Sequence, residues 1–380
     1  LVGFDNIKIN AHYFDDLVNQ MKNKPQQFID RVLKTSYWKK EGGGRMKFDA
    51  VVGNPPYQEE TGGAGRQAKP IYNYFVEQAK KLNPTYISMI TPSRWFSGGM
   101  GLDDFRDNMI LDNQLIKLKD YTNAKDCFPQ ISISGGVSYF LWGSKYHGDC
   151  SVENVHDGKS SIAVRPTNEF RVFVRYNEAV SILHKIIDDN YNSIDGIISP
   201  LMPFGLSTNH RGRNNKSNID NLTLYASNGF TYIKRTEINK GTEYIDKYKV
   251  MMSKMSAEHA GEADKNGQFR IFTKTMRVLK PLETCTHSYF LIGCYDNELE
   301  AQNTMTYLKT KFVRFIVMTT LSAVNLSKLV FFYVPMQDFS ANSDIDWSKS
   351  VRAIDRQLYA KYGLSDEEID FIEDKIKPME

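Results

Sequence analysis

The stretch FDAVVGNPPYQ, residues 48–58, decides how the first part of the chain folds. Phe48–Val52 reads as a buried strand that runs into Gly53. Asn54, Pro55, Pro56 and Tyr57 follow, and the prolines lack a backbone N–H and have a fixed φ, so the strand is predicted to end in a rigid turn. Two prolines by themselves indicate only such a turn, and the rest of the sequence must show whether it also carries chemistry.

Predicted strands and helices alternate after this turn. In chain order they are a helix at 71–82, a strand at 86–90, a helix at 102–111, a strand at 115–121 and a long strand at 131–142. The last two strands follow each other without a helix. This order predicts an α/β fold, with a mostly parallel, helix-covered sheet and an antiparallel hairpin at its edge. Helical spacing at 14–33, broken by Pro25, predicts two short helices before the sheet.

The pattern changes after Gly143. Residues 145–170 are polar without a clear period, a helix is expected at about 178–188, and basic, aromatic, Gly- and Asn-rich sequence continues to residue 280. Residues 288–333 predict a strand, a helix and a strand around a separate core, and 347–377 predict an acidic, amphipathic helical tail. We therefore predict two domains, 1–165 and 166–380, the second of the α+β class.

The composition is typical of a globular protein, with 41% hydrophobic and 24% charged residues. No apolar run reaches the roughly 18 residues of a membrane span, so no membrane association is expected. The 4 cysteines form no C-x-x-C pair and the 7 histidines no H-x-x-x-H pair, so we expect no metal centre and a reducing, cytoplasmic location. No convincing E-x-K nuclease site follows a strand.

The net charge of +3 is unevenly distributed. Residues 200–280 hold 14 Lys and Arg against 7 Asp and Glu, whereas residues 281–380 hold 10 against 15. The basic stretch indicates either a solvated surface or a polyanionic partner. For a DNA partner, the side chains able to contact phosphates and base edges are Arg211, Arg213, Lys216, Lys234, Arg235, Lys274 and Arg277.

The turn at 54–57 has the groups needed to activate the exocyclic amine of a nucleobase. Ligands bind at the carboxyl ends of parallel strands, which is where this turn lies. The amine is a poor nucleophile because its lone pair is delocalised into the ring. The Asn54 side-chain oxygen and the Pro55 carbonyl could accept its two hydrogens and favour a localised lone pair, while Pro56 keeps that carbonyl rigid. Tyr57 offers a face for stacking a base that has flipped out of the duplex.

Asn-Pro-Pro-Tyr after a buried strand resembles the motif of amino-methylating DNA methyltransferases, chiefly the N6-adenine enzymes of restriction–modification systems. The stretches 87–96, ISMITPSRWF, and 126–142, DCFPQISISGGVSYFLW, resemble the following strand and the last catalytic hairpin of that family. The resemblance implies a Rossmann-like methyltransferase sheet, followed by a target-recognition domain over roughly 195–345. It also implies that Phe128, just before Pro-Gln, packs on the other side of the flipped adenine.

The resemblance further implies S-adenosylmethionine as cofactor, with its methyl group near Asn54 and Pro55, double-stranded DNA as substrate, and restriction or specificity subunits as partners. The family's glycine-rich cofactor loop has no counterpart in residues 1–47. Gly42-Gly43-Gly44 follows no predicted strand, and the permuted candidate Ile292–Asp296 lacks a second glycine. We therefore expect only the C-terminal half of the sheet, in an N-terminally truncated chain whose binding of cofactor is in question.

Two other functions remain open from the sequence. A non-catalytic subunit could use residues 200–280 to recognise a DNA sequence without transferring a methyl group. Related Asn-Pro-Pro-Tyr sites also methylate glutamine amides, so an RNA or protein methyltransferase is the third reading, and the large basic second domain favours duplex DNA over it.

Overall fold

The computed structural model describes residues 11–38, 43–59, 68–131, 133–156, 158–218, 221–258, 263–321 and 325–379. The chain divides into two compact units that interleave along the sequence. The first unit holds residues 1–120, 137–153 and 162–171, and the second holds 121–136, 154–161 and 172–380. The predicted domains 1–165 and 166–380 stay a prediction. Over the described ranges, no helix has the length and apolar character to cross a membrane.

Two short helices precede the sheet of the first unit, as the sequence predicted. They are α1 (Leu17–Asn23) and α2 (Pro25–Val32). Pro25 is the first residue of α2, a position where the missing N–H breaks no helical hydrogen bond. Both helices pack on α3 (Tyr72–Lys81), and their buried side chains form a small core of Met21, Phe28, Ile29, Val32 and Leu33.

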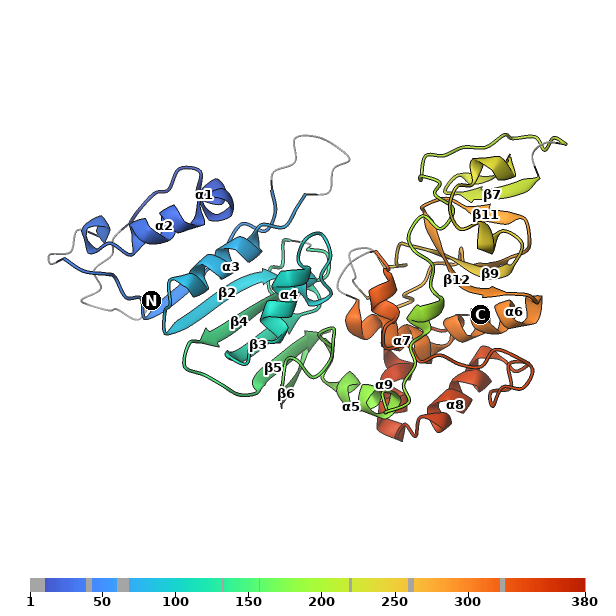
Figure 1. Ribbon diagram of the computed structural model, residues 1–380. Coiled ribbons are helices and arrows are strands. Elements are labelled where there is room, and N and C mark those ends of the chain that lie inside the picture. Colours follow the sequence, from blue (N-terminus) through green and yellow to red (C-terminus); the bar gives the residue numbers. More distant parts are fainter. Residues whose placement is uncertain are drawn as a thin grey trace. The chain divides into compact units, whose positions relative to one another are not determined.

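The first unit is built on a mixed sheet with the strand order β1-β2-β4-β3-β5-β6 (Figure 1). The strands are β1 (Ala50–Gly53), β2 (Tyr86–Pro92), β3 (Leu115–Tyr121), β4 (Val137–Gly143), β5 (Cys150–His156) and β6 (Lys159–Arg165). Strand β1 is parallel to β2, and β4 is antiparallel to β2. Helix α3 packs on β2, and α4 (Asp103–Ile110) packs on the turn that follows β2.

The expectation of an antiparallel hairpin at the edge of the sheet is wrong in two respects. Strand β4 lies inside the sheet, between β2 and β3, because β5 and β6 continue the sheet beyond β3. The predicted strand 131–142 begins only at Val137. Gly135 and Gly136 have φ values of 84° and 80°, and a Cβ on Gly136 would lie 2.1 Å from the Tyr121 carbonyl oxygen. The chain therefore makes a tight turn before β4.

Strands β5 and β6 lie in residues 145–170, where the sequence showed no clear period. In β5 every second residue is buried, but two of the buried residues are Asn154 and His156. In β6 the apolar residues Ile162 and Val164 are 67% and 70% exposed. Polar side chains inside and apolar side chains outside conceal the alternation on which strand prediction depends.

The second unit contains two three-stranded sheets, of order β10-β9-β12 and β11-β7-β8. Their strands are β7 (Leu222–Ala226), β8 (Gly229–Ile233), β9 (Tyr248–Ser253), β10 (Arg277–Leu279), β11 (Glu283–Cys285) and β12 (Tyr289–Tyr295). One hydrophobic core joins the two sheets, since it contains Leu222, Leu224 and Ile233 from one and Met251 and Leu291 from the other.

Five described helices complete the second unit. They are α5 (Glu178–Ile186), α6 (Glu298–Lys309), α7 (Lys311–Thr320), α8 (Val351–Lys361) and α9 (Asp366–Lys375). Every residue of α7 is buried, so this helix is the centre of the helical part. The predicted last strand within 288–333 is wrong: Lys328–Phe331 forms a 3-10 turn. A short apolar run does not by itself distinguish a strand from another buried element.

Candidate active site

The Asn-Pro-Pro-Tyr turn begins one residue after β1, at the carboxyl end of that strand. Gly53 is the last residue of β1 and pairs with Met89 of the parallel strand β2. Asn54 and Pro56 are exposed, Pro55 is buried and Tyr57 is half-buried. The buried proline thus anchors the turn in the unit, while the Asn54 amide is accessible to a ligand.

Backbone hydrogen bonds join the end of the turn to the residues before α3. The Ile71 N–H donates to the Tyr57 carbonyl oxygen at 3.2 Å, and the Glu59 N–H donates to the Lys69 carbonyl oxygen at 2.9 Å. Ile71, the donor of the first of these hydrogen bonds, is only 2% exposed. Strand β1 holds one end of the turn and this pairing holds the other, so the geometry of 54–57 is set from both sides.

The turn after β2 brings a second set of polar groups to the same edge of the sheet. Ser93 Oγ donates to Asp120 Oδ1 at 2.7 Å, and both residues are fully buried. Ser93 begins the 3-10 turn Ser93–Phe96, and Asp120 lies near the end of β3. The sequence patterns considered above did not indicate this pair, although a serine directly after a strand and an aspartate at the end of another are signals in the sequence.

Aromatic side chains support this edge from within. Trp95 and Phe96 are 1% and 0% exposed, with ring centroids 4.5 Å apart, and Trp95 also contacts Phe105 of α4 at 5.9 Å. Tyr72 of α3 lies nearby, and burial raises the pKa of its hydroxyl. Burial also lowers the pKa of Arg94. The loop that follows β2 is therefore held by packing, which keeps the strand ends beside Asn54 rigid.

Phe128, the expected second stacking residue, belongs to the other compact unit. It is half-buried, and its N–H donates to the Ala124 carbonyl oxygen at 2.7 Å, directly after the 3-10 turn Ala124–Asp126. Its stacking on a flipped adenine stays a prediction.

The described glycines among the candidates for a cofactor loop do not form a suitable cradle. Gly42 lies outside the described residues, and Gly43 and Gly44 follow the 3-10 turn Thr35–Trp38 instead of a strand. Gly293 has a φ of 75°, and a Cβ there would lie 2.2 Å from the Tyr295 ring, so this glycine serves packing within β12. The described residues therefore fit the amine-activating part of the reaction but not a cofactor loop.

Two of the expected DNA-binding arginines lie on one face of the β11-β7-β8 sheet. Arg213 and Tyr232 of β8 form an antiparallel bridge, with backbone hydrogen bonds of 2.8 and 2.9 Å. The Arg277 guanidinium lies over the Tyr225 ring of β7, 4.9 Å from its centroid. Arg213 and Arg277 are both exposed.

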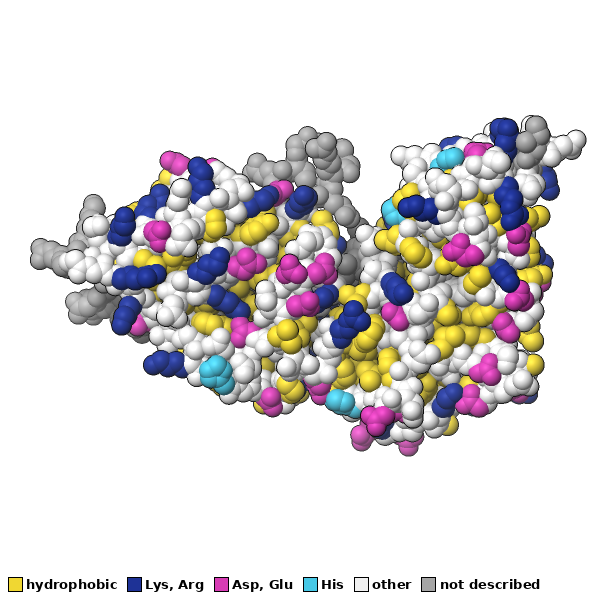
Figure 2. Space-filling model, in the orientation of Figure 1, with side chains coloured by type: hydrophobic (Ala, Val, Ile, Leu, Met, Phe, Trp, Pro, Cys, Tyr) yellow, Lys and Arg dark blue, Asp and Glu magenta, His cyan; other side chains and the backbone are white. Residues whose placement is uncertain are grey.

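The other expected DNA-binding residues are placed differently. Arg211 Nη1 donates to the carbonyl oxygens of Thr208 and His210 in its own loop, at 2.8 and 2.9 Å. Arg235 forms a two-point ion pair with Asp246. Lys216 and Lys274 are exposed and Lys234 is half-buried. Figure 2 shows basic side chains interspersed with acidic ones over this part of the chain. DNA binding by these residues stays a prediction.

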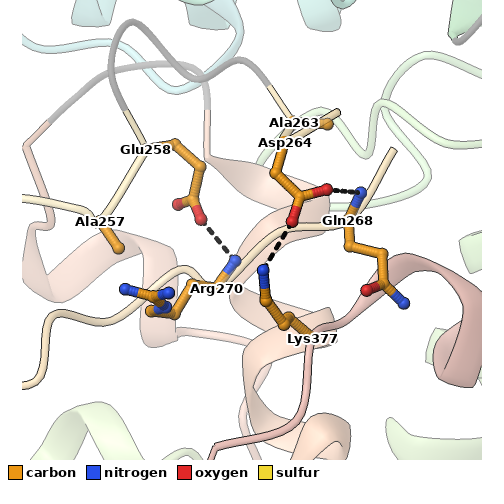
Figure 3. Close-up of a pocket in the computed structure, with 7 residues that line it drawn as sticks. All are labelled: Ala257, Glu258, Ala263, Asp264, Gln268, Arg270 and Lys377. Carbon is orange, nitrogen blue, oxygen red and sulfur yellow. Dashed lines mark hydrogen bonds and ion pairs between the residues drawn. The ribbon is translucent and has the colours of Figure 1, made fainter. Parts of the chain in front are cut away.

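In a pocket of about 340 Å³ in the second unit, three of the charged side chains, Glu258, Asp264 and Lys377, take part in hydrogen bonds or ion pairs (Figure 3). Asp264 and Lys377 form an ion pair at 2.8 Å, and this bond, together with backbone N–H groups, lowers the pKa of Asp264 to about 2. Glu258 accepts the Arg270 N–H and, at 3.0 Å, the Ile271 N–H. These contacts hold the chain around the pocket in place and give no sign of catalysis.

Comparison with known proteins places the turn in a family context. Residues 1–128 match the model of the Eco57I restriction-modification methylase family, and this range contains Asn54–Tyr57. The chain is 32% identical over 160 residues to an uncharacterized adenine-specific methylase of Mycoplasma pneumoniae. That alignment covers 40% of this chain and 38% of the relative, so the chain spans well under half of the relative's length.

Two solved structures of restriction–modification enzymes are also similar. The type IIL enzyme MmeI, in complex with DNA, aligns with a TM-score of 0.44 and 7% identity over 86% of this chain and 56% of that chain. The type IIG restriction endonuclease BpuSI aligns with a TM-score of 0.32 and 11% identity over 85% of this chain and 52% of that chain. The family match over residues 1–128 confirms the predicted similarity to restriction–modification methylases, and the curated relative confirms the similarity to an adenine-specific methylase. The Asn-Pro-Pro-Tyr motif predicted both.

Proposed function

We propose that this chain is part of a DNA methyltransferase of a restriction–modification system that methylates the N6 amine of a flipped adenine. The observation that carries the proposal is the turn 54–57, with Asn54 exposed and Pro55 buried at the carboxyl end of β1. The family match over residues 1–128 supports it. In the complete protein the methyl donor is S-adenosylmethionine, and double-stranded DNA is the substrate.

The contribution assigned to this chain is preparation of the amine. Asn54 Oδ1 and the Pro55 carbonyl oxygen accept the two N–H groups of the adenine amine. These bonds become stronger as the nitrogen turns pyramidal and its hydrogens gain positive charge, so they stabilise the transition state more than the ground state. Tyr57 stacks on one face of the base, which offsets part of the cost of taking the base out of the duplex.

Removal of the Asn54 amide tests this role in the complete protein. We expect Asn54→Ala to lower the rate of methyl transfer from labelled cofactor by about 10²–10³-fold, with little change in DNA affinity. Gln58→Ala is the matched control, because Gln58 is an exposed amide in the same loop that pairs with Pro70 through its backbone. A wild-type rate in Asn54→Ala would exclude the proposed role of this residue.

A further inference from the structure

The outer face of the β11-β7-β8 sheet carries a row of aromatic rings. In β7 the side chains of Leu222 and Leu224 are buried in the core, and the alternation of the strand places Tyr225 on the opposite face, although this partly buried ring also contacts the core. Its partner across the strand pair is Phe230 of β8, which is 60% exposed. The Tyr225 and Phe230 centroids are 6.3 Å apart, and the Phe230 and Tyr232 centroids are 6.2 Å apart.

Phe230 lies at the tip of a short hairpin. Ala226 and Gly229 are the last paired residues of β7 and β8, so only Ser227 and Asn228 connect the strands. Gly229 has a φ of 122°, a conformation that glycine adopts readily in such a turn. The ring next to this turn therefore projects from a rigid element and keeps more than half of its surface in solvent.

Two arginines accompany the rings on this face. Antiparallel pairing places the side chain of Arg213 on the same face as that of its partner Tyr232. Arg277 lies over the Tyr225 ring at 4.9 Å. Glu283 also lies beside these rings, and its Oε1 accepts the Tyr225 hydroxyl at 3.1 Å. We call Arg213, Tyr225, Phe230, Tyr232 and Arg277 the aromatic face.

This combination suits a nucleic acid whose bases are accessible. An exposed ring can stack on any nucleobase, since every base has a π-face, and arginine can contact the phosphates beside it. The charge of the region is complementary to DNA, with 14 basic against 7 acidic residues in 200–280.

We propose that the aromatic face binds DNA by stacking Phe230 on an unpaired nucleobase, with Arg213 and Arg277 along the adjoining phosphates. The inference rests on the proposed function for the identity of the nucleic acid. It goes beyond that function because it assigns a second base-contacting site, in a different compact unit from Asn54.

The test uses the 380-residue chain and a short DNA strand with one 2-aminopurine, presented unpaired or within a duplex. We expect the parent chain to quench the unpaired fluorophore. Phe230→Ala should weaken binding of the unpaired strand by about 5- to 100-fold, the effect of losing one stacked base. Phe230→Tyr should keep the affinity, whereas Phe230→Leu, which is apolar without a π-face, should lose most of it.

Leu299→Ala is the matched control, because Leu299 is 52% exposed on α6, outside the aromatic face. Circular dichroism and a thermal melt will show whether each variant is folded. Equal affinity of parent and Phe230→Ala would overturn the inference, as would fluorescence that the parent chain leaves unchanged. The methyl-transfer test of Asn54→Ala is made on the complete protein and depends on a residue of the other unit, so either proposal can fail while the other stands.

Discussion

At the scale of single residues, backbone carbonyls take the place of counterions around two buried cations of the second unit, Lys249 and Arg314. Lys249 of β9 is 0% exposed, and its Nζ donates to the carbonyl oxygens of Lys247 at 2.9 Å and Lys280 at 3.1 Å. Arg314 of α7, also 0% exposed, donates to those of Lys377 and Arg270. Both cations hold chain segments together, so neither marks an anion-binding site.

The titration of Lys249 should make the free energy of unfolding of this unit depend on pH in the alkaline range. Burial lowers the pKa of its ammonium to about 8, well below the roughly 10.4 of an unfolded lysine. Between these values the unfolded chain binds a proton that the folded chain does not, so the free energy of unfolding rises with pH across this window. The rise is on the order of 3 kcal/mol, and it is absent below pH 8, where both states are protonated.

Urea unfolding of the parent chain and Lys249→Met between pH 7 and 10.5 measures this effect. The difference in stability between the two proteins should shift in favour of the parent chain as the pH rises. A difference that stays constant over this range would show that the lysine titrates normally in the folded protein.

At the scale of the element, the position of Arg213 depends on how closely the loop that contains Gly212 and Arg213 approaches β8. The Gly212 N–H donates to Thr231 Oγ1 at 3.2 Å. A Cβ on Gly212 would lie 2.4 Å from the Tyr232 carbonyl oxygen, the atom that accepts the Arg213 N–H. The pairing of this loop with β8 therefore requires glycine at position 212.

Gly212→Ala should detach this loop from β8. We expect a loss of about 1–3 kcal/mol in the free energy of unfolding, the usual cost of overpacking, and a DNA affinity as low as that of Arg213→Gln. Gly196→Ala is the control, because an added Cβ there meets no atom within 4 Å. Denaturation and DNA titration are the measurements, and unchanged values for Gly212→Ala would contradict the requirement for glycine.

At the scale of the whole molecule, the net charge differs between segments of the chain, and this uneven distribution affects how strongly a polyanion can bind. The excess of basic residues at 200–280 is followed by an excess of acidic residues at 281–380, so the net charge of +3 hides a basic region. Some basic side chains within that region are already neutralised, as Arg235 is by Asp246. The total charge alone therefore overstates the number of phosphate contacts.

Salt dependence of DNA binding should show whether Arg213 and Lys216 contribute more to phosphate contacts than Arg235 does. Arg213→Gln and Lys216→Gln together should reduce the slope of log K against log salt by about 0.9 for each phosphate contact that is lost. Arg235→Gln should leave the slope close to that of the parent, since this side chain is bound to Asp246. Equal slopes for all three proteins would identify the basic stretch as a solvated surface.

Local sequence patterns were sufficient to predict many of the helices and strands of the first unit. Strand β3 occupies the predicted residues 115–121, and helices α3 and α4 differ by one residue at each end from their predictions. The turn 54–57 and its position after a strand were also predicted, because apolar periodicity and proline stereochemistry act over a few neighbouring residues. The prediction that this strand is buried and spans 48–52 was wrong, since β1 is Ala50–Gly53 and Val52 is 77% exposed.

Tertiary structure alone decided which distant residues meet. Three features depend on pairings between remote segments of the chain. They are the insertion of β4 between β2 and β3, the buried pair Ser93 and Asp120, and the outward face shared by Arg213 and Phe230. The sequence by itself predicted most elements of the first unit and the Asn-Pro-Pro-Tyr motif, which lies within the residues 1–128 that match a methylase family. Which basic side chains are engaged within the chain, as Arg235 is with Asp246, and which rings lie beside the others, depends on hydrogen bonds and packing that no local period encodes.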